Sequence, residues 1–160
     1  AALLALARAE GVHEGLVGTL ETAGEAVRLS PQRRGALSGV DRYAVAAGQL
    51  GRTIEDVRAL ARGTMRAINA EDAVPAEAMR AIGQLTASAR ALKDYFGGGN
   101  PEPAREAATR AAALANGVLE STGNLSAVHI VGQIRLAAVD LLRATGLPRE
   151  EAQQAVRGAR

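Results

Sequence analysis

The chain has 160 residues, contains neither Cys nor Trp, and carries a formal net charge of +2 at pH 7. This length suits one domain, and a domain of this size needs neither disulfides nor a structural metal to be stable. The absence of Cys excludes disulfide scaffolds, thiol catalysis and the common zinc modules. The two histidines, His13 and His129, lie far apart in the sequence. We therefore expect no metal site and no cofactor.

Alanine and arginine dominate the composition, with 36 Ala and with Arg as 18 of the 19 basic residues. Both favour helices, whereas the β-branched and aromatic residues typical of strands are few. Three aromatic residues cannot supply the stacking platform typical of single-strand binding, and a net charge of +2 is small for a nucleic-acid reader. The composition predicts an all-α protein that does not bind nucleic acid.

The longest stretch without a formal charge runs from Ser121 to Ile134, which is 14 residues. A helix needs about 20 mostly apolar residues to span a bilayer, so we expect that this chain does not cross a membrane. The sequence begins with neither an initiator Met nor the pattern of a signal peptide. The expectation is a fragment of a longer protein.

The first predicted helix runs from about Leu3 to Leu29 and stops at Ser30 and Pro31. The second, from about Leu37 to Asn69, has the clearest amphipathic pattern, and we expect its apolar arc to be buried. That arc contains Val40, Tyr43, Ala47, Leu50, Ile54, Val57, Ala61, Met65 and Ile68. Charged residues, including Arg52, Glu55, Asp56, Arg58, Arg62 and Arg66, occupy the opposite side.

Pro75 opens a third predicted helix, which ends at about Phe96 before a run of three glycines. Its apolar set is Met79, Ile82, Leu85, Ala89 and Leu92. The remaining predicted helices cover about Pro103 to Ser121, Leu125 to Thr145 and Arg149 to Arg157. Short loops between helices favour antiparallel packing. We predict one domain over residues 1–160, an antiparallel bundle of about five main helices with a short helix at the C-terminus.

The sequence has no motif typical of an enzyme. The glycines at 97 to 99 follow a helix and lack the GK[ST] ending of a phosphate-binding loop. Ser, His and Asp all occur, but no Gly-x-Ser-x-Gly turn is present. We expect a protein that is not an enzyme and has no catalytic residue.

Arg58, Arg62 and Arg66 repeat every four residues and form a basic ladder on the outer side of the second helix. Such a ladder is favourable near anionic lipid headgroups. The simpler interpretation is a solvated helix face, balanced by the neighbouring Glu55 and Asp56, and it is the one we favour.

The fifth predicted helix places one arginine among its apolar residues. Arg135 falls inside the apolar arc, where an unpaired charge must reach the edge of the bundle or find a carboxylate. Glu120 and Asp56 are candidate partners. If Arg135 lies at the rim, as we favour, Arg135→Leu leaves the melting temperature almost unchanged, whereas a buried ion pair predicts a loss of several degrees.

Three stretches give the chain a likeness to a known family. Residues 27–34 (VRLSPQRR) are similar to a basic "RLSPxRR" turn, and residues 54–62 (IEDVRALAR) to an "AVRNxRVLARR" helix. Residues 131–146 (VGQIRLAAVDLLRATG) are similar to an "AQxRSxxxDLLRATG" helix. The chain thus resembles the soluble helical domain that follows the membrane helices of bacterial FUSC-family proteins, the fusaric acid resistance or aromatic acid exporter group. Glu55 and Asp56 depart from the pattern of the second stretch.

The resemblance covers about residues 2–156 and implies a cytoplasmic domain of an inner-membrane exporter of aromatic acids. It implies partners in the membrane-embedded part of the same protein, with a homo-oligomer and a small aromatic acid as further partners. It assigns no catalytic residue. We expect an accessory domain for assembly or regulation, with Arg33, Arg34, Arg58 and Arg62 as contacts to the membrane side or to partner subunits. We also expect a polar network between helices that contains Gln133, Arg135, Asp140 and Arg143.

Two other functions remain open at this point. One is a helical module that binds small acidic molecules between its helices, with Arg135 holding a carboxylate through two hydrogen bonds. An elongated apolar cavity that reaches Arg135 would favour this module, and a solidly packed core would argue against it. The other is a separate helical domain for protein interactions.

Overall fold

The structure is a computed structural model that describes residues 2–29, 37–121 and 123–160. In this part of the chain it contains six α-helices and no strand, which confirms the predicted all-α fold. The helices are α1 (Ala2–Arg28), α2 (Leu37–Asn69), α3 (Ala76–Phe96), α4 (Glu102–Ser121), α5 (Leu125–Ala144) and α6 (Arg149–Gly158). The predicted boundaries differ from these by at most one residue.

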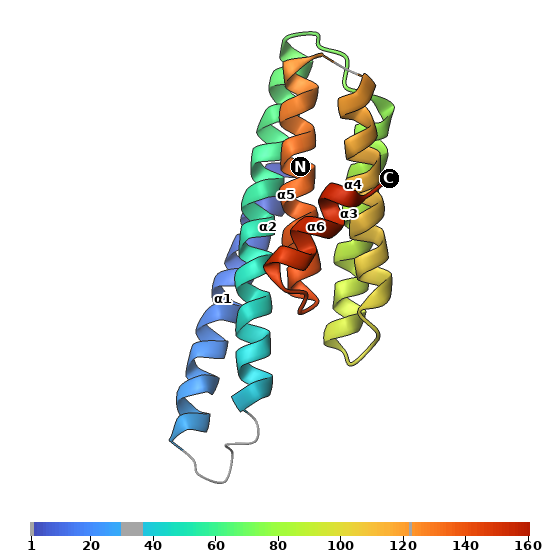
Figure 1. The fold of residues 1–160 in the computed structure, drawn as a ribbon. Helices are drawn as coiled ribbons and strands as arrows, with labels where there is room; N and C mark the ends of the chain where they lie inside the picture. Colours follow the sequence, from blue (N-terminus) through green and yellow to red (C-terminus); the bar gives the residue numbers. More distant parts are fainter. Residues whose placement is uncertain (1, 30–36, 122) are drawn as a thin grey trace.

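The long helices run alternately up and down, as Figure 1 shows, and form the predicted antiparallel bundle. Helix α5 lies at its centre and packs against α2, α3, α4 and α6. Among the described residues, α1 packs against α2 alone, and the end of α1 and the start of α2 extend below the rest of the described helices in Figure 1. Helix α6 crosses the bundle obliquely and contacts α4 and α5.

Small side chains allow α4 to lie close to its neighbours. Six alanines of α4 are buried: Ala104, Ala107, Ala108, Ala111, Ala112 and Ala115. Helix axes approach more closely where the side chains between them are small. The larger core side chains come mainly from α5 and include Ile130, Ile134, Leu141 and Leu142, each at most 1% exposed. The high alanine content of the sequence therefore fills the interior, and this packed core argues against a module that holds a ligand in an elongated apolar cavity between its helices.

By length and composition, α5 is apolar enough to span a membrane, a property that central helices of water-soluble bundles share. The uncharged run in this segment is too short to predict a membrane span. Average hydropathy identifies the helix nevertheless, because it tolerates the charges near the end of the helix. Many of its apolar side chains are buried against the other helices. In this structure α5 is the central helix of the bundle.

The expectation of one buried apolar arc along α2 is wrong at several positions. Tyr43, Val57, Met65 and Ile68 are 39%, 36%, 54% and 65% exposed, respectively. The buried positions of α2 are mostly small and include Ala46, Ala47, Leu60, Gly63 and Ala67. Helix α2 contacts α1 and α5, which lie on different sides of it, so its buried surface does not follow a single stripe. On α3, Met79 and Ala89 of the predicted apolar set are also exposed.

Hydrogen bonds to the ends of α5 and α6 fix where α6 lies. Gly146 has φ +88° and ends the last turn of α5, in a conformation that favours glycine. Arg105 of α4 donates to Thr145 Oγ1 at 2.9 Å. Asn116 of α4 donates to the carbonyl oxygens of Val156 and Ala159, both at 3.0 Å. Helix α4 therefore anchors both the turn that precedes α6 and the end of α6.

Candidate functional site

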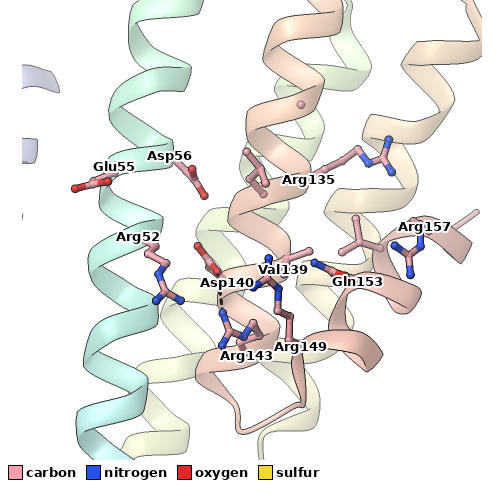
Figure 2. Close-up of a pocket in the computed structure, with 13 residues that line it drawn as sticks. Arg52, Glu55, Asp56, Arg135, Val139, Asp140, Arg143, Arg149, Gln153 and Arg157 are labelled. Carbon is pink, nitrogen blue, oxygen red and sulfur yellow. Dashed lines mark ion pairs between the residues drawn. The ribbon is translucent and has the colours of Figure 1, made fainter.

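A cleft of about 760 Å³ opens between α2, α5 and α6 and is rich in charged side chains (Figure 2). Each helix contributes one face, because the lining residues follow helical spacing. Arg52, Glu55 and Asp56 come from α2, and Arg149, Gln153, Val156 and Arg157 come from α6. Gly132, Arg135, Leu136, Val139, Asp140 and Arg143 come from α5. The buried apolar residues of α5 occupy other sides of this helix, so its sequence places one side in the core and another in the cleft.

Five arginines and three acidic residues line the cleft. Arg143 Nη1 lies 3.9 Å from Asp140 Oδ1, which is a long ion pair. Arg52 donates to Gln49 Oε1 at 3.0 Å. The other three arginines, Arg135, Arg149 and Arg157, form no ion pair with any residue that the structure describes. Arg149 already favours the ionised form of Asp140, so Arg135 and Arg157 are the cationic groups of the cleft that remain to bind an anion.

Two carboxyl groups face one another in this cleft. Figure 2 shows Asp56 on α2 and Asp140 on α5 pointing toward each other. Burial raises the pKa of Asp56 to about 6, and the charges of Asp140 and Glu55 add to this increase. Burial also raises the pKa of Asp140, although the nearby arginines Arg52, Arg143 and Arg149 oppose the shift. Asp56 therefore titrates at about pH 6, whereas the arginines near Asp140 favour the ionised form of that carboxyl group.

Aliphatic side chains supply the apolar surface of the cleft. Leu136 and Val139 of α5 line it from one side, and Val156 of α6 lines it from another. The aromatic residues Tyr43, Tyr95 and Phe96 do not line it and form a separate cluster, with ring centroids 5.4 and 6.1 Å apart. A ligand here would contact aliphatic carbon and guanidinium groups instead of aromatic rings.

The structure brings together three of the four residues predicted as an interhelical polar network. Arg135, Asp140 and Arg143 line the cleft, whereas Gln133 does not, and Gln133 makes no hydrogen bond with any described residue. Arg135 is partly exposed and has no ion pair with either predicted partner. In Figure 2 its side chain extends away from Asp56, toward the side of the cleft where Arg157 lies. Arg135 thus lies at the rim, as the favoured interpretation predicts.

The residues predicted as membrane-side or partner contacts lie in different places. Arg33 and Arg34 lie outside the described residues. The predicted basic ladder places Arg58 on a free outer face of the helix. In the structure Arg58 instead forms an ion pair with Glu10 of α1 and so joins two helices. Arg62 is exposed on α2. The ladder is therefore interrupted at its first residue.

Four residues that line the cleft are not among the site residues predicted from the sequence: Arg52, Arg149, Gln153 and Arg157. The signal was the i, i+4, i+8 spacing of Arg149, Gln153 and Arg157, which places them on one face of a short helix. The direction in which α6 crosses the bundle depends on the Gly146 turn and on the contacts of α4 with α6. Those contacts connect positions about 40 residues apart, so the pattern of a single helix does not show them.

Among the described residues, no group of three or more His, Asp or Glu side chains could hold a metal ion. The comparisons with known proteins give no family for this chain. No protein-family model, no curated protein and no solved structure matches it.

Proposed function

We propose that this chain is a helical accessory domain that binds small organic anions in the cleft between α2, α5 and α6. The observation that carries the proposal is the pair Arg135 and Arg157, which have no ion pair in the described structure and lie beside the aliphatic Leu136 and Val156. Guanidinium groups bind carboxylates through paired, charge-assisted hydrogen bonds. Small-molecule sites combine an apolar surface with a few polar groups of this kind. The proposed role is binding and not catalysis.

We also propose that the parent protein is a FUSC-like transporter of the inner membrane, with this domain on the cytoplasmic side. Support comes from the three similar stretches, two of which line the same cleft. Arg135, Asp140 and Arg143 belong to the third stretch, whereas Glu55 and Asp56, which line the cleft from the second stretch, are the positions that depart from the family pattern. The organic anion would then be an aromatic acid or a related compound. The role of the domain would be assembly or regulation.

An exposed apolar end of the bundle supports a partner contact for such a domain. The large apolar residues involved are Met65, Ile68, Met79, Leu119, Leu125 and Val128, which are 38% to 84% exposed. They lie where α2 and α4 end and where α3 and α5 begin, at the top of Figure 1. Exposed apolar surface of this kind is typical of contacts with another protein part. We propose the membrane-embedded part of the same protein as that partner.

The coding sequence upstream of Ala1 tests the assignment to a transporter. About six membrane-spanning segments are expected there, because a stretch of about 20 apolar residues marks each span. A short open reading frame that starts at a nearby Met and encodes no membrane span would contradict the assignment. This result would leave the proposal of an anion-binding cleft untouched.

Isothermal titration calorimetry with benzoate, and with neutral benzamide as the control ligand, tests the cleft directly. We expect benzoate to bind and benzamide to give no heat. Removal of a charged hydrogen-bond partner weakens binding by about 1.5–3 kcal/mol, so Arg135→Gln should lower the affinity for benzoate at least tenfold. Arg90→Gln, on the exposed side of α3, is the matched control and should bind like the wild type. An absence of heat up to about millimolar benzoate would overturn the proposal, because a Kd above about 1 mM corresponds to less than about 4 kcal/mol of binding free energy.

A variant that fills the cleft without changing its charges tests whether benzoate needs the space of the cleft itself. A Cβ atom added at Gly132 meets no atom within 4 Å, and Gly132 lines the cleft, so Gly132→Leu should fold and extend its side chain into the cleft. Gly83→Leu on α3 also enters open space and is the control. We expect benzoate binding to be lost in Gly132→Leu and retained in Gly83→Leu. Equal affinity in both variants would contradict binding in the cleft.

Arg135→Leu distinguishes a role in binding from a role in stability. Because Arg135 lies at the rim and has no ion pair in the described structure, its replacement should change the melting temperature by less than about 2 °C, which corresponds to about 0.5–1 kcal/mol in a chain of this size. Circular dichroism at 222 nm measures this change. A loss of several degrees would show that Arg135 has a structural partner.

A further inference from the structure

We propose that the cleft takes up a proton when it binds an organic anion, and that the Asp56 carboxylate accepts it. This inference rests on the proposed function, since it concerns the same cleft. It adds that ligand affinity depends on pH although the charge of the ligand does not change. The proton comes from the buffer, whose conjugate acid loses it as the carboxylate of Asp56 becomes a neutral carboxyl group.

The geometry provides the basis for the coupling. Asp56 and Asp140 approach from α2 and α5 and face one another in Figure 2. Asp56 forms no ion pair with a described residue, whereas Asp140 lies 3.9 Å from Arg143. Two carboxylates that face each other in a partly buried site repel, and one of them then tends to hold a proton. A ligand anion held by Arg135 and Arg157 brings a third negative charge into the same cleft.

Charged groups on every helix packed around Asp56 bear on this equilibrium. On α2 itself these groups are Arg52 and Glu55, and on α5 they are Arg135, Asp140 and Arg143. Helix α6 contributes Arg149 and Arg157 to the other wall of the cleft. Helix α1 packs against α2 with Glu10, which is paired with Arg58, and with His13, which bonds to the carbonyl oxygen of Ala47. Among these groups, the carboxylates of Asp140 and Glu55 oppose the ionisation of Asp56, and so does its burial.

The two carboxyl groups differ in how well arginines stabilise their charge. Arg52, Arg143 and Arg149 all favour the ionised form of Asp140. None of them is among the causes that shift the pKa of Asp56, which burial and two neighbouring carboxylates raise to about 6. At neutral pH Asp56 is therefore largely ionised yet close to protonation. A bound anion raises this pKa further, so binding draws a proton onto Asp56.

Binding and protonation are linked reciprocally. If an anion raises the pKa of Asp56, protonation of Asp56 must raise the affinity for the anion by the same factor. Affinity should then increase as pH falls from about 7.5 to about 5.5, by at most tenfold per pH unit for one proton. We expect an increase of several-fold over this range.

Calorimetry with benzenesulfonate tests the proposal, because a sulfonate remains ionised throughout this pH range. Titrations at pH about 6.5 in Bis-Tris and in imidazole measure the proton uptake from the difference in buffer ionisation enthalpy. Both buffers are cationic and do not compete for the arginines. The expected result for the wild type is an uptake of a substantial fraction of one proton, together with a higher affinity at the lower pH.

Variants assign the proton to a residue. Asp56→Asn should bind benzenesulfonate with an affinity that is independent of pH, whereas Asp94→Asn on the exposed side of α3 should keep the pH dependence of the wild type. If Asp140→Asn and not Asp56→Asn removes the dependence, the assignment to Asp56 is overturned. Binding that is equally tight at both pH values, without proton uptake, overturns the inference and leaves the proposed function standing. An absence of binding at both pH values overturns the proposed function itself.

Discussion

At the scale of single residues, both histidines of the chain lie against glycines of α2. A Cβ atom at Gly51 would lie 2.7 Å from the ring of His13, and one at Gly63 would lie 2.8 Å from the ring of His129. His13 also bonds through Nε2 to the carbonyl oxygen of Ala47 at 2.8 Å. Glycine is unfavourable inside a helix, so these two positions weaken α2 locally but allow the rings of α1 and α5 to approach.

Gly51→Ala should therefore destabilise the protein although alanine is the better helix former. The new methyl group displaces the His13 ring and separates α1 from α2, and chemical denaturation should show a lower free energy of unfolding. Gly48→Ala, three residues earlier in α2, meets no atom within 4 Å. That control should stabilise the protein by roughly 0.5–1 kcal/mol. If both substitutions stabilise, the close contact of His13 with Gly51 is not important for packing.

The raised pKa of Asp56 makes stability depend on pH with a defined sign. The folded-state pKa of about 6 exceeds the ordinary value of 3.8, so folding favours the protonated form. The contribution of Asp56 to the free energy of unfolding is therefore fully present below about pH 4. This contribution is lost as the pH rises through about 6. Asp56→Asn should therefore unfold at a higher temperature than the wild type at pH 8, and at the same temperature near pH 4.

The size of this effect is modest because Asp56 is only about half-buried and solvent screens its charge. We expect a gain of about 1 kcal/mol at pH 8, or roughly 2–4 °C in melting temperature for a chain of this length. Asp94→Asn is the control and should show no comparable difference between the two pH values. A variant Asp56→Asn that is less stable than the wild type at pH 8 would contradict the repulsion between the facing carboxylates.

At the scale of elements, one amide of α4 determines how α6 is held. Asn116 donates to two carbonyl oxygens at the end of α6, each at 3.0 Å, and these oxygens have no partner within their own helix. Its side chain thus acts as a cap supplied by another helix. Because α6 carries Arg149 and Arg157, this cap also stabilises one wall of the cleft.

Asn116→Ala should loosen α6 while the other helices remain packed. Loss of two hydrogen bonds to carbonyl groups predicts a decrease of about 1–3 kcal/mol in the free energy of unfolding. Hydrogen exchange should show faster exchange of the amides of α6 and little change in those of α3. Anion binding should weaken in parallel, since two of its arginines lose their fixed position. Unchanged exchange in α6 would show that contacts other than Asn116 hold this helix.

Within the part of the chain that the structure describes, α1 is the helix with the fewest neighbours, since it packs against α2 alone. It also contains several glycines in exposed positions, among them Gly11, Gly15 and Gly18. Few buried contacts and weak helix propensity predict local opening at a low free energy. The amides of α1 should therefore exchange well before those of α5 in the native protein. Equal protection of both helices would indicate that α1 has a further partner in solution.

At the scale of the whole molecule, local patterns predict the helices well and their contacts poorly. Proline and glycine residues such as Pro75 and Gly146 mark boundaries directly, and a 3.6-residue period marks the buried face of α5. The face of α2 was predicted incorrectly because Met65 and Ile68 belong to the apolar arc by spacing but are 54% and 65% exposed among the described residues. Spacing records which residues share a face and not whether another helix covers it.

The same limit applies to the cleft. Arg135, Asp140 and Arg143 could be predicted from the sequence of α5 alone, because they are charged residues within or beside its apolar arc. The sequence predicted Asp56 as a charge on the polar side of the second helix and as a candidate partner for Arg135, whereas the structure places it opposite Asp140. The wall formed by α6 depends on tertiary hydrogen bonds from α4. A site built from three helices emerges only once their packing is known.

The most direct test of the account is a titration of the isotope-labelled protein with benzoate, followed by amide chemical shifts in two-dimensional NMR. Gly132 lines the cleft, and its amide signal is readily recognised as that of a glycine. The account predicts the largest saturable shifts at Gly132 and at Gln153 across the cleft, with little change at Gly83 on α3. No saturable shift up to about millimolar benzoate, or shifts centred on another part of the bundle, would contradict the claim that this cleft binds organic anions.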